Sequence, residues 1–531
     1  MTNSRWLATA LLVVAFGACT NEKIVFKNRE PFNPPPDGAF LGYFTVDTKQ
    51  TTCGNCHVGA QTNWAQTKHS EAWGDLQASG HASGSCNACH SVSELGNDVG
   101  HPAGYSVKAD SAYHDVQCES CHGPGYTHVQ NPTALNEPLA SIAADTGIDN
   151  GCGGCHTGTH EPFVDQWVQS AHGSGEALSH TAGNVSCTPC HEGQGALTVK
   201  FGVTGNFAEK GSATPLHITC VVCHDPHGGP NEGQLRASIS TPTTDNLCVR
   251  CHSRSGTPPW GVAATIGSTA RGAHGAQGLL VIGQNIGWFP PNFAYDTTLI
   301  VSSHGTSANP RLCATCHVAQ TTITDKATGA FQFQSVGHLF DAIPCTDNTG
   351  IPIPGDCAVT QRDFSACSNG ACHIGGPTTA RAAYITVISN LDNLLDQLWD
   401  DTNNDSIIEG TDGGLLAAMV ARGTAADSAA LNFGSNVTTT AKGALWNAAL
   451  AATDDKQYFL GGKVFGRGFA THMASGNGVH NPFLLQSLLS ASIDAVRSEY
   501  GLPAPPNYDT TIHATMPPGA RVKVSGQRVS R

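Results

Sequence analysis

Apolar residues recur at helical spacing in the last third of the chain. Two runs show this pattern: the first comprises Ile385, Ile388, Leu391, Leu395 and Leu398, and the second begins with Leu415, Leu416, Met419 and Val420. Residues three and four positions apart share one face of a helix, so both runs predict amphipathic helices.

A further helix is predicted to begin after residue 480, because start and stop signals accompany an apolar face. Asn481 can cap it, Pro482 fits its first turn and Gly501 ends it. Its apolar face comprises Leu485, Leu488, Leu489, Ile493 and Val496. His480 therefore stands at a rigid helix start, where a side chain can be presented precisely.

The loop "DTNNDSIIEGTD" at 401–412 joins two of these predicted helices. Read as a calcium loop, its oxygen ligands would be Asp401, Asn403, Asp405, the Ile407 carbonyl, Glu409 and Asp412. Ser406 replaces the usual turn glycine, and Asp412 stands where a bidentate Glu is typical. The alternative is a solvated acidic turn between two helices.

The first apolar stretch, Trp6–Ala18, is too short to span a membrane and is typical of a signal-peptide core. Gly17 and Ala18 precede Cys19, as at a lipoprotein processing site, although Phe16 replaces the usual Leu. We expect Cys19 to carry a lipid; the alternative is a plain secretory signal. We expect no membrane contact other than this anchor.

Composition points away from an ordinary globular enzyme. Of 531 residues, 60 are Gly and 29 are Pro, which favours loops over long helices or strands. The net charge is −14 with no basic run, so a nucleic-acid partner is not expected.

Eight stretches fit the pattern C-x-x-C-H. They are Cys53, Cys56 and His57; Cys86, Cys89 and His90; Cys118, Cys121 and His122; Cys152, Cys155 and His156; Cys187, Cys190 and His191; Cys220, Cys223 and His224; Cys248, Cys251 and His252; and Cys313, Cys316 and His317. Two thiols at this spacing can add to the two vinyl groups of one haem, and the His then lies beneath the iron as proximal ligand. Neither a zinc ribbon nor a disulfide framework requires His after every second Cys.

The stretch "CSNGACH" at 367–373 has the same order of residues but a longer spacing. His373 directly follows Cys372, and Cys367 lies five positions before Cys372. We expect a ninth haem here, which leaves Cys345 and Cys357 as a disulfide pair in an oxidising compartment. The alternative is two disulfides among these four cysteines.

Residues 53–128 and 152–227 resemble each other, and this repeat sorts the other histidines. Each unit contains a W-x4-H element, three haem motifs and a closing His. The expected distal iron ligands are the paired His69 and His172, His81 and His180, His114 and His217, His128 and His227, together with His480. The remaining histidines outside the motifs are weaker candidates for distal ligands, because no second copy marks them: His101, His160, His274, His304, His338, His472 and His513.

Seven haems within 200 residues leave no room for an ordinary hydrophobic core. We therefore expect a multihaem cytochrome c fold of irregular loops and short α-helices wrapped around packed haems, with little β structure and a helical C-terminal third. The expected divisions are a signal peptide (1–18), a linker (19–50), three-haem modules (51–150 and 151–240), a loop-rich region with three further haems (241–378), a helical region (379–501) and an extended tail (502–531).

The haem motifs, the W-x4-H elements, "CHGPG", "CHDPHG" and the "VHNP" helix together resemble exported bacterial multihaem c-type cytochromes, over residues 50–500. This resemblance implies mostly bis-histidine, low-spin haems used for electron transfer. Some members are outer-surface lipoproteins serving extracellular respiration, and some polymerise into filaments. Others reduce nitrogen or sulfur oxyanions at one haem with an open position.

Three functions follow as hypotheses. The first is an electron conduit with nine haems c, exported and either lipid-anchored at the outer membrane or cell surface, or free in the periplasm or outside the cell, with other cytochromes or redox proteins as partners. The second is a multihaem oxidoreductase with one open haem, for which no catalytic residue can be named. The third is a homopolymeric filament subunit.

Overall fold

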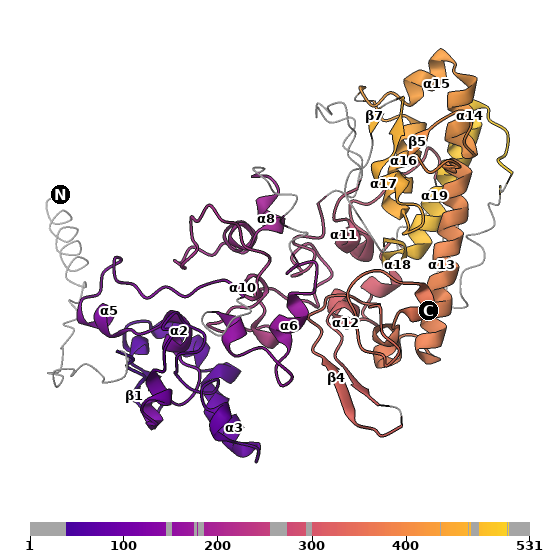
Figure 1. The fold of residues 1–531 in the computed structure, drawn as a ribbon. Coiled ribbons are helices and arrows are strands. Elements are labelled where there is room, and N and C mark those ends of the chain that lie inside the picture. The colour runs from indigo at the N-terminus through magenta and orange to yellow at the C-terminus, as the bar shows by residue number, and fades with distance from the viewer. Residues whose placement is uncertain are drawn as a thin grey trace, which may run out of the picture.

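The computed structural model describes residues 39–144, 151–174, 178, 185–254, 273–293, 300–325, 327–435, 437–465, 467–468, 477–506 and 508. Cys19, His180, His472 and His513 lie outside these residues, as do the expected signal peptide and most of the tail. Figure 1 shows a loop-rich N-terminal part that leads into a group of longer helices.

Up to residue 375 the secondary structure consists of short pieces. The helices are α2 (Val58–Trp64), α3 (Ala72–Ala78), α4 (Cys118–His122), α5 (Tyr126–Gln130), α6 (Phe163–Trp167), α8 (Thr188–His191), α9 (Gly193–Gly195), α10 (Cys220–Cys223), α11 (Gln277–Ile282) and α12 (Cys313–His317). Turns of 3₁₀ helix are η1 (Cys53–Asn55), η2 (Lys68–Glu71), η3 (Gly84–Cys86), η4 (Gly104–Ser106), η5 (Ser111–Tyr113), η6 (Cys152–Gly154), η8 (Glu232–Gln234), η10 (Ser303–Gly305), η11 (Val359–Gln361) and η12 (Ser365–Ala371), and η7 (Ala196–Lys200) is a π-helix. Helices this short are not stable alone in water, so tertiary contacts must hold them.

Strands are few and pair only locally. β1 (Tyr43–Thr45) pairs antiparallel with β2 (Gln50–Thr51), and β3 (Thr321–Thr324) pairs antiparallel with β4 (Phe331–Ser335). β5 (Ile407–Ile408) runs parallel to β6 (Lys463–Val464), which pairs antiparallel with β7 (Arg467–Gly468). None of these sheets closes on itself within the described residues.

The C-terminal helices surround the largest apolar core. They are α13 (Gly376–Leu398), α14 (Gly414–Arg422), α15 (Ala425–Ala430), α16 (Thr440–Ala451), α17 (Tyr458–Gly461), α18 (Asn477–His480) and α19 (Pro482–Tyr500). α16 and α19 pack closely, and α13 lies against both (Figure 1). A side chain at Gly443 of α16 would place its Cβ 2.1 Å from the Trp288 ring, so this close approach requires glycine.

The apolar clusters before α13 are much smaller than the core beneath it. One surrounds Leu197 and Val222, and another surrounds Phe40 and Val92. Side chains alone therefore supply only limited burial to the loop-rich part of the described chain. No helix among the described residues combines the length and the apolar character that crossing a membrane requires.

Candidate haem-binding sites

The nine cysteine motifs are numbered here in chain order as sites 1 to 9, from Cys53–His57 (site 1) to Cys367–His373 (site 9). In several motifs a single helical turn joins the residues. The His224 amide donates to the Cys220 carbonyl at 2.9 Å, and the His156 amide donates to the Cys152 carbonyl at 2.9 Å. Residues four apart lie on one side of such a turn, so the first Cys and the His face the same way.

The cysteines divide into two chemical groups. Cys345 and Cys357 form a disulfide with their Cα atoms 5.9 Å apart. The remaining described cysteines are all free thiols, and they are the cysteines of the nine motifs. Cys367 and Cys372 are among them, so both remain available for the addition to a vinyl group that thioether attachment requires.

Eight of the nine motif histidines face a second histidine ring. The pairs, with the distance between ring centroids, are His57–His128 (6.5 Å), His122–His227 (6.1 Å), His156–His69 (6.0 Å), His191–His274 (6.0 Å), His224–His338 (6.2 Å), His252–His172 (6.3 Å), His317–His480 (6.1 Å) and His373–His304 (6.4 Å). Most pairs join segments that are distant in sequence.

These distances fit a metal ion held between the two rings. A metal–imidazole bond is about 2.0 Å long, and the distance from each nitrogen to the centre of its ring adds to this on both sides, so two imidazoles that ligated one iron from opposite sides would have centroids roughly 6 Å apart. Direct stacking of two rings allows a closer approach, such as the 4.0 Å between Trp73 and His114. The residues present thus fit bis-histidine haem iron.

The structure brings five of the expected distal histidines opposite a motif histidine: His69, His128, His172, His227 and His480. His114 instead stacks on Trp73, and His217 meets the edge of Trp167 at 6.2 Å. His81 is exposed. Neither His81, His114 nor His217 faces a motif histidine in the described structure, and His180 lies outside it.

Three histidines that face a motif histidine are the weaker candidates of the sequence analysis: His274, His304 and His338. The repeat ends near residue 227, so no second copy marks these positions. His338 forms part of the short turn after β4, and His304 lies in a 3₁₀ turn before site 8, although the motif histidine that it faces is His373 of site 9. Only the tertiary fold brings His274 to site 5, His304 to site 9 and His338 to site 6, so a single sequence carried no signal for them.

Backbone carbonyls orient many of the rings. His90, His122, His224 and His317 contact the carbonyls of Ala72, Pro138, Gly233 and Phe340 through Nδ1 at 2.6–2.9 Å. His304 contacts the Val479 carbonyl in the same way at 2.8 Å. A proton held on Nδ1 leaves Nε2 as the free donor atom for a metal.

Carboxylates take this place at two rings. Glu161 Oε2 lies 3.6 Å from Nδ1 of His156, and Asp225 Oδ1 lies 3.4 Å from Nδ1 of His227. The carboxylates raise the pKa of both histidines. Burial lowers the pKa of His69 and His172 to about 4, so these two rings are neutral at pH 7, as iron ligation requires.

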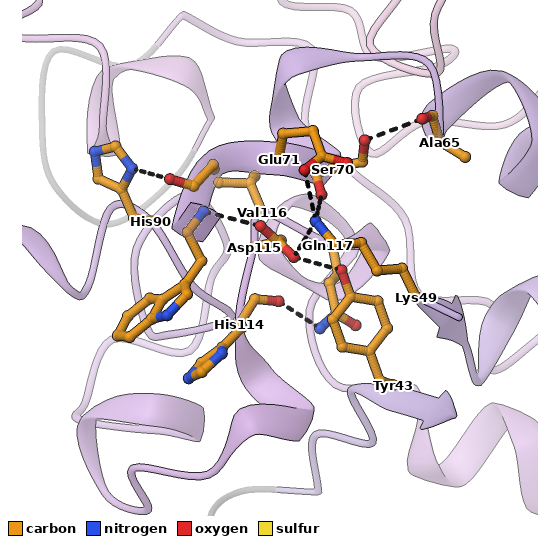
Figure 2. A network of polar contacts seen from close by, with 12 residues as sticks. Tyr43, Lys49, Ala65, Ser70, Glu71, His90, His114, Asp115, Val116 and Gln117 are labelled. Atoms are coloured by element: carbon orange, nitrogen blue, oxygen red, sulfur yellow. Dashed lines mark hydrogen bonds and ion pairs between the residues drawn. The ribbon is translucent and has the colours of Figure 1, made fainter. Parts of the chain in front are cut away.

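A polar network centred on Asp115 fixes the segment between sites 1 and 2 (Figure 2). The buried Asp115 carboxylate accepts the Tyr43 hydroxyl at 2.7 Å and the Trp73 amide at 2.8 Å, and it pairs with Lys49 at 3.2 Å. The neighbouring Val116 amide donates to the His69 carbonyl at 3.1 Å. These bonds hold the chain that carries His69 and the Ala72 carbonyl beside His90.

The W-x4-H elements have the same anchor in both repeat units. The indole N–H of Trp64 donates to the Val116 carbonyl, and that of Trp167 donates to the Ile218 carbonyl, each at 2.9 Å. Both acceptors lie two residues before the first Cys of the third motif in their unit. Each Trp thereby positions the His five residues later in the chain. His69 faces His156 of site 4, and His172 faces His252 of site 7.

Contacts between motif thiols connect the sites. Five pairs of motif thiols lie close enough for each thiol to shift the pKa of the other: Cys53–Cys118, Cys89–Cys155, Cys152–Cys220, Cys190–Cys251 and Cys248–Cys313. Electrostatic interactions link Cys121 to Cys152, Cys223 to Cys248 and Cys316 to Cys367. The contacts follow one line through sites 1, 3, 4, 6, 7, 8 and 9, with site 2 beside site 4 and site 5 beside site 7.

The loop at 401–412 folds as a turn between α13 and α14. The Asp401 carboxylate accepts the Ser406 amide at 2.8 Å, and Asp412 accepts the Glu409 amide at 3.0 Å and the Trp399 indole N–H at 3.1 Å. The described residues contain no group of three or more His, Cys, Asp or Glu side chains arranged to hold a metal. Calcium binding here stays a prediction.

Comparison with known proteins gives the same class as the motifs. Residues 52–123 match the family of cytochrome c554 and c-prime, and residues 214–257 match the doubled CXXCH motif. The chain is 28% identical over 197 residues to the multiheme cytochrome MtrA of Shewanella baltica, a match that covers 33% of this chain and 54% of the relative. No solved structure matches.

Two relatives from Geobacter sulfurreducens are also similar. The identity is 29% over 170 residues with the C-type polyheme cytochrome OmcC, covering 26% of this chain and 22% of the relative. With the C-type polyheme cytochrome OmcB it is 26% over 195 residues, covering 32% and 24%. The matches thus span about half of one relative and less than a quarter of the others.

The motifs, the facing histidines and these matches define the class: the chain is a multihaem c-type cytochrome. Its cofactor is haem c.

Proposed function

We propose that this cytochrome is an exported electron conduit with nine covalently attached haems c and histidine on both faces of each iron. The observation that carries the proposal is the set of eight motif histidines that face a second histidine at 6.0–6.5 Å. A haem held in this way exchanges single electrons, and the two histidines leave no position for a substrate on the iron.

The order of the sites supports conduction along the chain. Motif thiols that interact with one another form a series from site 1 to site 9, so each attached haem would have a neighbour near it. The short helices and loops up to residue 378 would wrap these haems, which would supply the burial that the small apolar clusters lack. We propose that the two three-haem modules and the following loop-rich region form one array.

Export fits the attachment of so many haems and the Cys345–Cys357 disulfide. We propose a lipid on Cys19 that tethers the protein at the outer membrane or cell surface, and other redox proteins as its partners. Assembly into a filament would be a special case of the same function, in which one copy supplies electrons to the next.

An oxyanion reductase is the second candidate, and one observation directs the search for its site. His90 of site 2 is the motif histidine that faces no other histidine ring among the described residues. Trp73, Tyr105 and His114 pack together nearby, with ring centroids 4.0–5.6 Å apart. An open iron would be sought here first.

The experiment that separates these functions starts from the holoprotein, reduced without oxygen. Its intact mass should correspond to nine haems. When it is mixed with a ferric chelate, we expect nine electrons to leave each chain. With nitrite, hydroxylamine or sulfite, and an excess of a reduced viologen to resupply electrons, we expect no sustained turnover. Catalytic reduction of one of these compounds would contradict the conduit and favour the reductase, and a mass with eight haems would exclude site 9.

A further inference from the structure

The carboxylate of Glu161 differs from every other described contact to a motif histidine. It follows the site 4 motif closely in sequence and lies 3.6 Å from Nδ1 of His156, whereas four other motif histidines contact neutral backbone carbonyls. A carboxylate places a full negative charge on this side of the ring. Glu161 is 39% exposed, so water and salt screen this charge in part.

Asp225 offers an internal comparison at site 3. Its Oδ1 lies 3.4 Å from the His227 ring, but its Oδ2 accepts a hydrogen bond from Arg236 at 2.9 Å. The guanidinium neutralises most of the charge that Asp225 would otherwise present. In the described part of the chain, the ionic contacts of Glu161 are to histidines alone.

The position of site 4 makes this charge matter. Cys152 and Cys155 interact electrostatically with thiols of sites 2, 3 and 6, so the line of sites branches at this point. A negative charge this close to the imidazole would stabilise the oxidised state of an iron that His156 ligates. The reduction potential of site 4 should then fall below those of its neighbours.

We infer that Glu161 is a positioning residue for electron transfer, which orients His156 and holds site 4 at the lowest reduction potential of the array. Electrons then reside mainly on the haems of sites 1 to 3 and of sites 5 to 9, and they pass through site 4 one at a time. The inference rests on the proposed ligation of one iron by His156 and His69.

The test is a redox titration of the Glu161→Gln holoprotein, followed by visible absorbance and by EPR. Gln keeps the size and polarity of the side chain but removes the charge. We expect one-ninth of the haem absorbance, at the lowest-potential end, to move upward. The ratio of oxidised to reduced haem at that site should change about tenfold, or 59 mV for one electron.

Two further variants make the result specific. Asp225→Asn should change the ratio of oxidised to reduced haem at site 3 less than threefold, because Arg236 already offsets the charge of Asp225. Glu161→Asp keeps the charge, so the ratio of oxidised to reduced haem at site 4 should stay within threefold of that in the parent protein. A tenfold change of this ratio in Glu161→Asp would show that charge is not the cause, even if Glu161→Gln failed to fold.

The inference is overturned if Glu161→Gln retains nine low-spin haems and titrates like the parent protein, a result that leaves the conduit intact. Failure of the proposed function would instead appear in the parent protein itself, as missing haems or a high-spin iron.

Discussion

At the scale of single residues, Glu119 shows how a variable motif position can hold the fold. It lies between the two cysteines of site 3 and is 3% exposed. Its carboxylate accepts the amides of Leu41, Gly42 and Gly125 at 2.7–2.8 Å. One side chain thus ties the first described residues and the start of α5 to the haem motif.

Replacing Glu119 by Ala should destabilise the N-terminal part strongly. Three N–H groups, two of them buried and one partly buried, would lose their acceptor. Each such loss costs about 1–3 kcal/mol, so the total should be about 3 kcal/mol or more. The midpoint of urea unfolding, followed by absorbance, measures this. Glu232→Ala removes only an exposed ion pair with Arg311 and should change stability by less than about 0.5 kcal/mol. Equal midpoints for the two variants would refute this role of Glu119.

Single residues also mark the limit of sequence analysis. The nine motif histidines could be named because their motifs are local. His69, His128, His172 and His227 could be proposed because the repeat marks them twice. His338 and His304 are brought to their sites only by tertiary packing, so no local pattern identifies them. For the same reason, nothing in the sequence set His114 apart as a ring that stacks on Trp73.

At the scale of elements, α18 and α19 present His480 to site 8. Asn481 caps α19 by accepting the Leu484 amide, and its side chain donates to the carbonyls of Leu280 and Ile300 at 2.9 Å. The helix start is therefore fixed to the segment around α11. His480 next to it lies parallel to the His317 ring, with an angle of 2° between the ring planes.

Asn481→Ala should loosen this arrangement. Loss of the cap and of two buried hydrogen bonds should cost about 2 kcal/mol or more. The ligand field at one iron should also change, because His480 loses its fixed support. EPR should show one altered low-spin signal among otherwise unchanged signals. The exposed Asn206→Ala serves as the control, and an identical spectrum for both variants would contradict the role of the cap.

The helices themselves show which elements a sequence pattern can predict. α13 and α19 cover two of the predicted apolar runs, and Asn481, Pro482 and Gly501 occupy the cap, first-turn and end positions. α16 was not predicted. All of its residues from Thr440 to Ala451 are buried, so it has no polar face and shows no helical periodicity. A helix enclosed on every side carries no amphipathic signal.

At the scale of the whole molecule, the haems on the line of sites should be essential to conduction, whereas the haems of sites 2 and 5, which lie beside the line and are called lateral here, should not. Site 7 touches sites 5, 6 and 8 through Cys248 and Cys251. Among the described residues, the thiols of site 2 interact with the line beside site 4, through Cys89 and Cys155. Loss of a haem from the line should therefore interrupt transfer, whereas loss of a lateral haem should not.

This difference can be measured on oriented protein. Val58 is 62% exposed beside site 1, so Val58→Cys supplies a thiol for attachment to gold. In that background, Cys248→Ala with Cys251→Ala should reduce conductance through the layer to the level of haem-free protein. Cys86→Ala with Cys89→Ala should leave it nearly unchanged. Both variants must retain the other eight haems by mass, and equal conductance would contradict the proposed order of sites.

The measurement that tests the central claim most directly is quantitative low-temperature EPR of the oxidised holoprotein. The account predicts that every iron carries two histidines, so nine low-spin irons per chain should be found and no high-spin signal. A high-spin signal amounting to one iron per chain would contradict it, because one haem would then have an open position and the protein would be a candidate reductase.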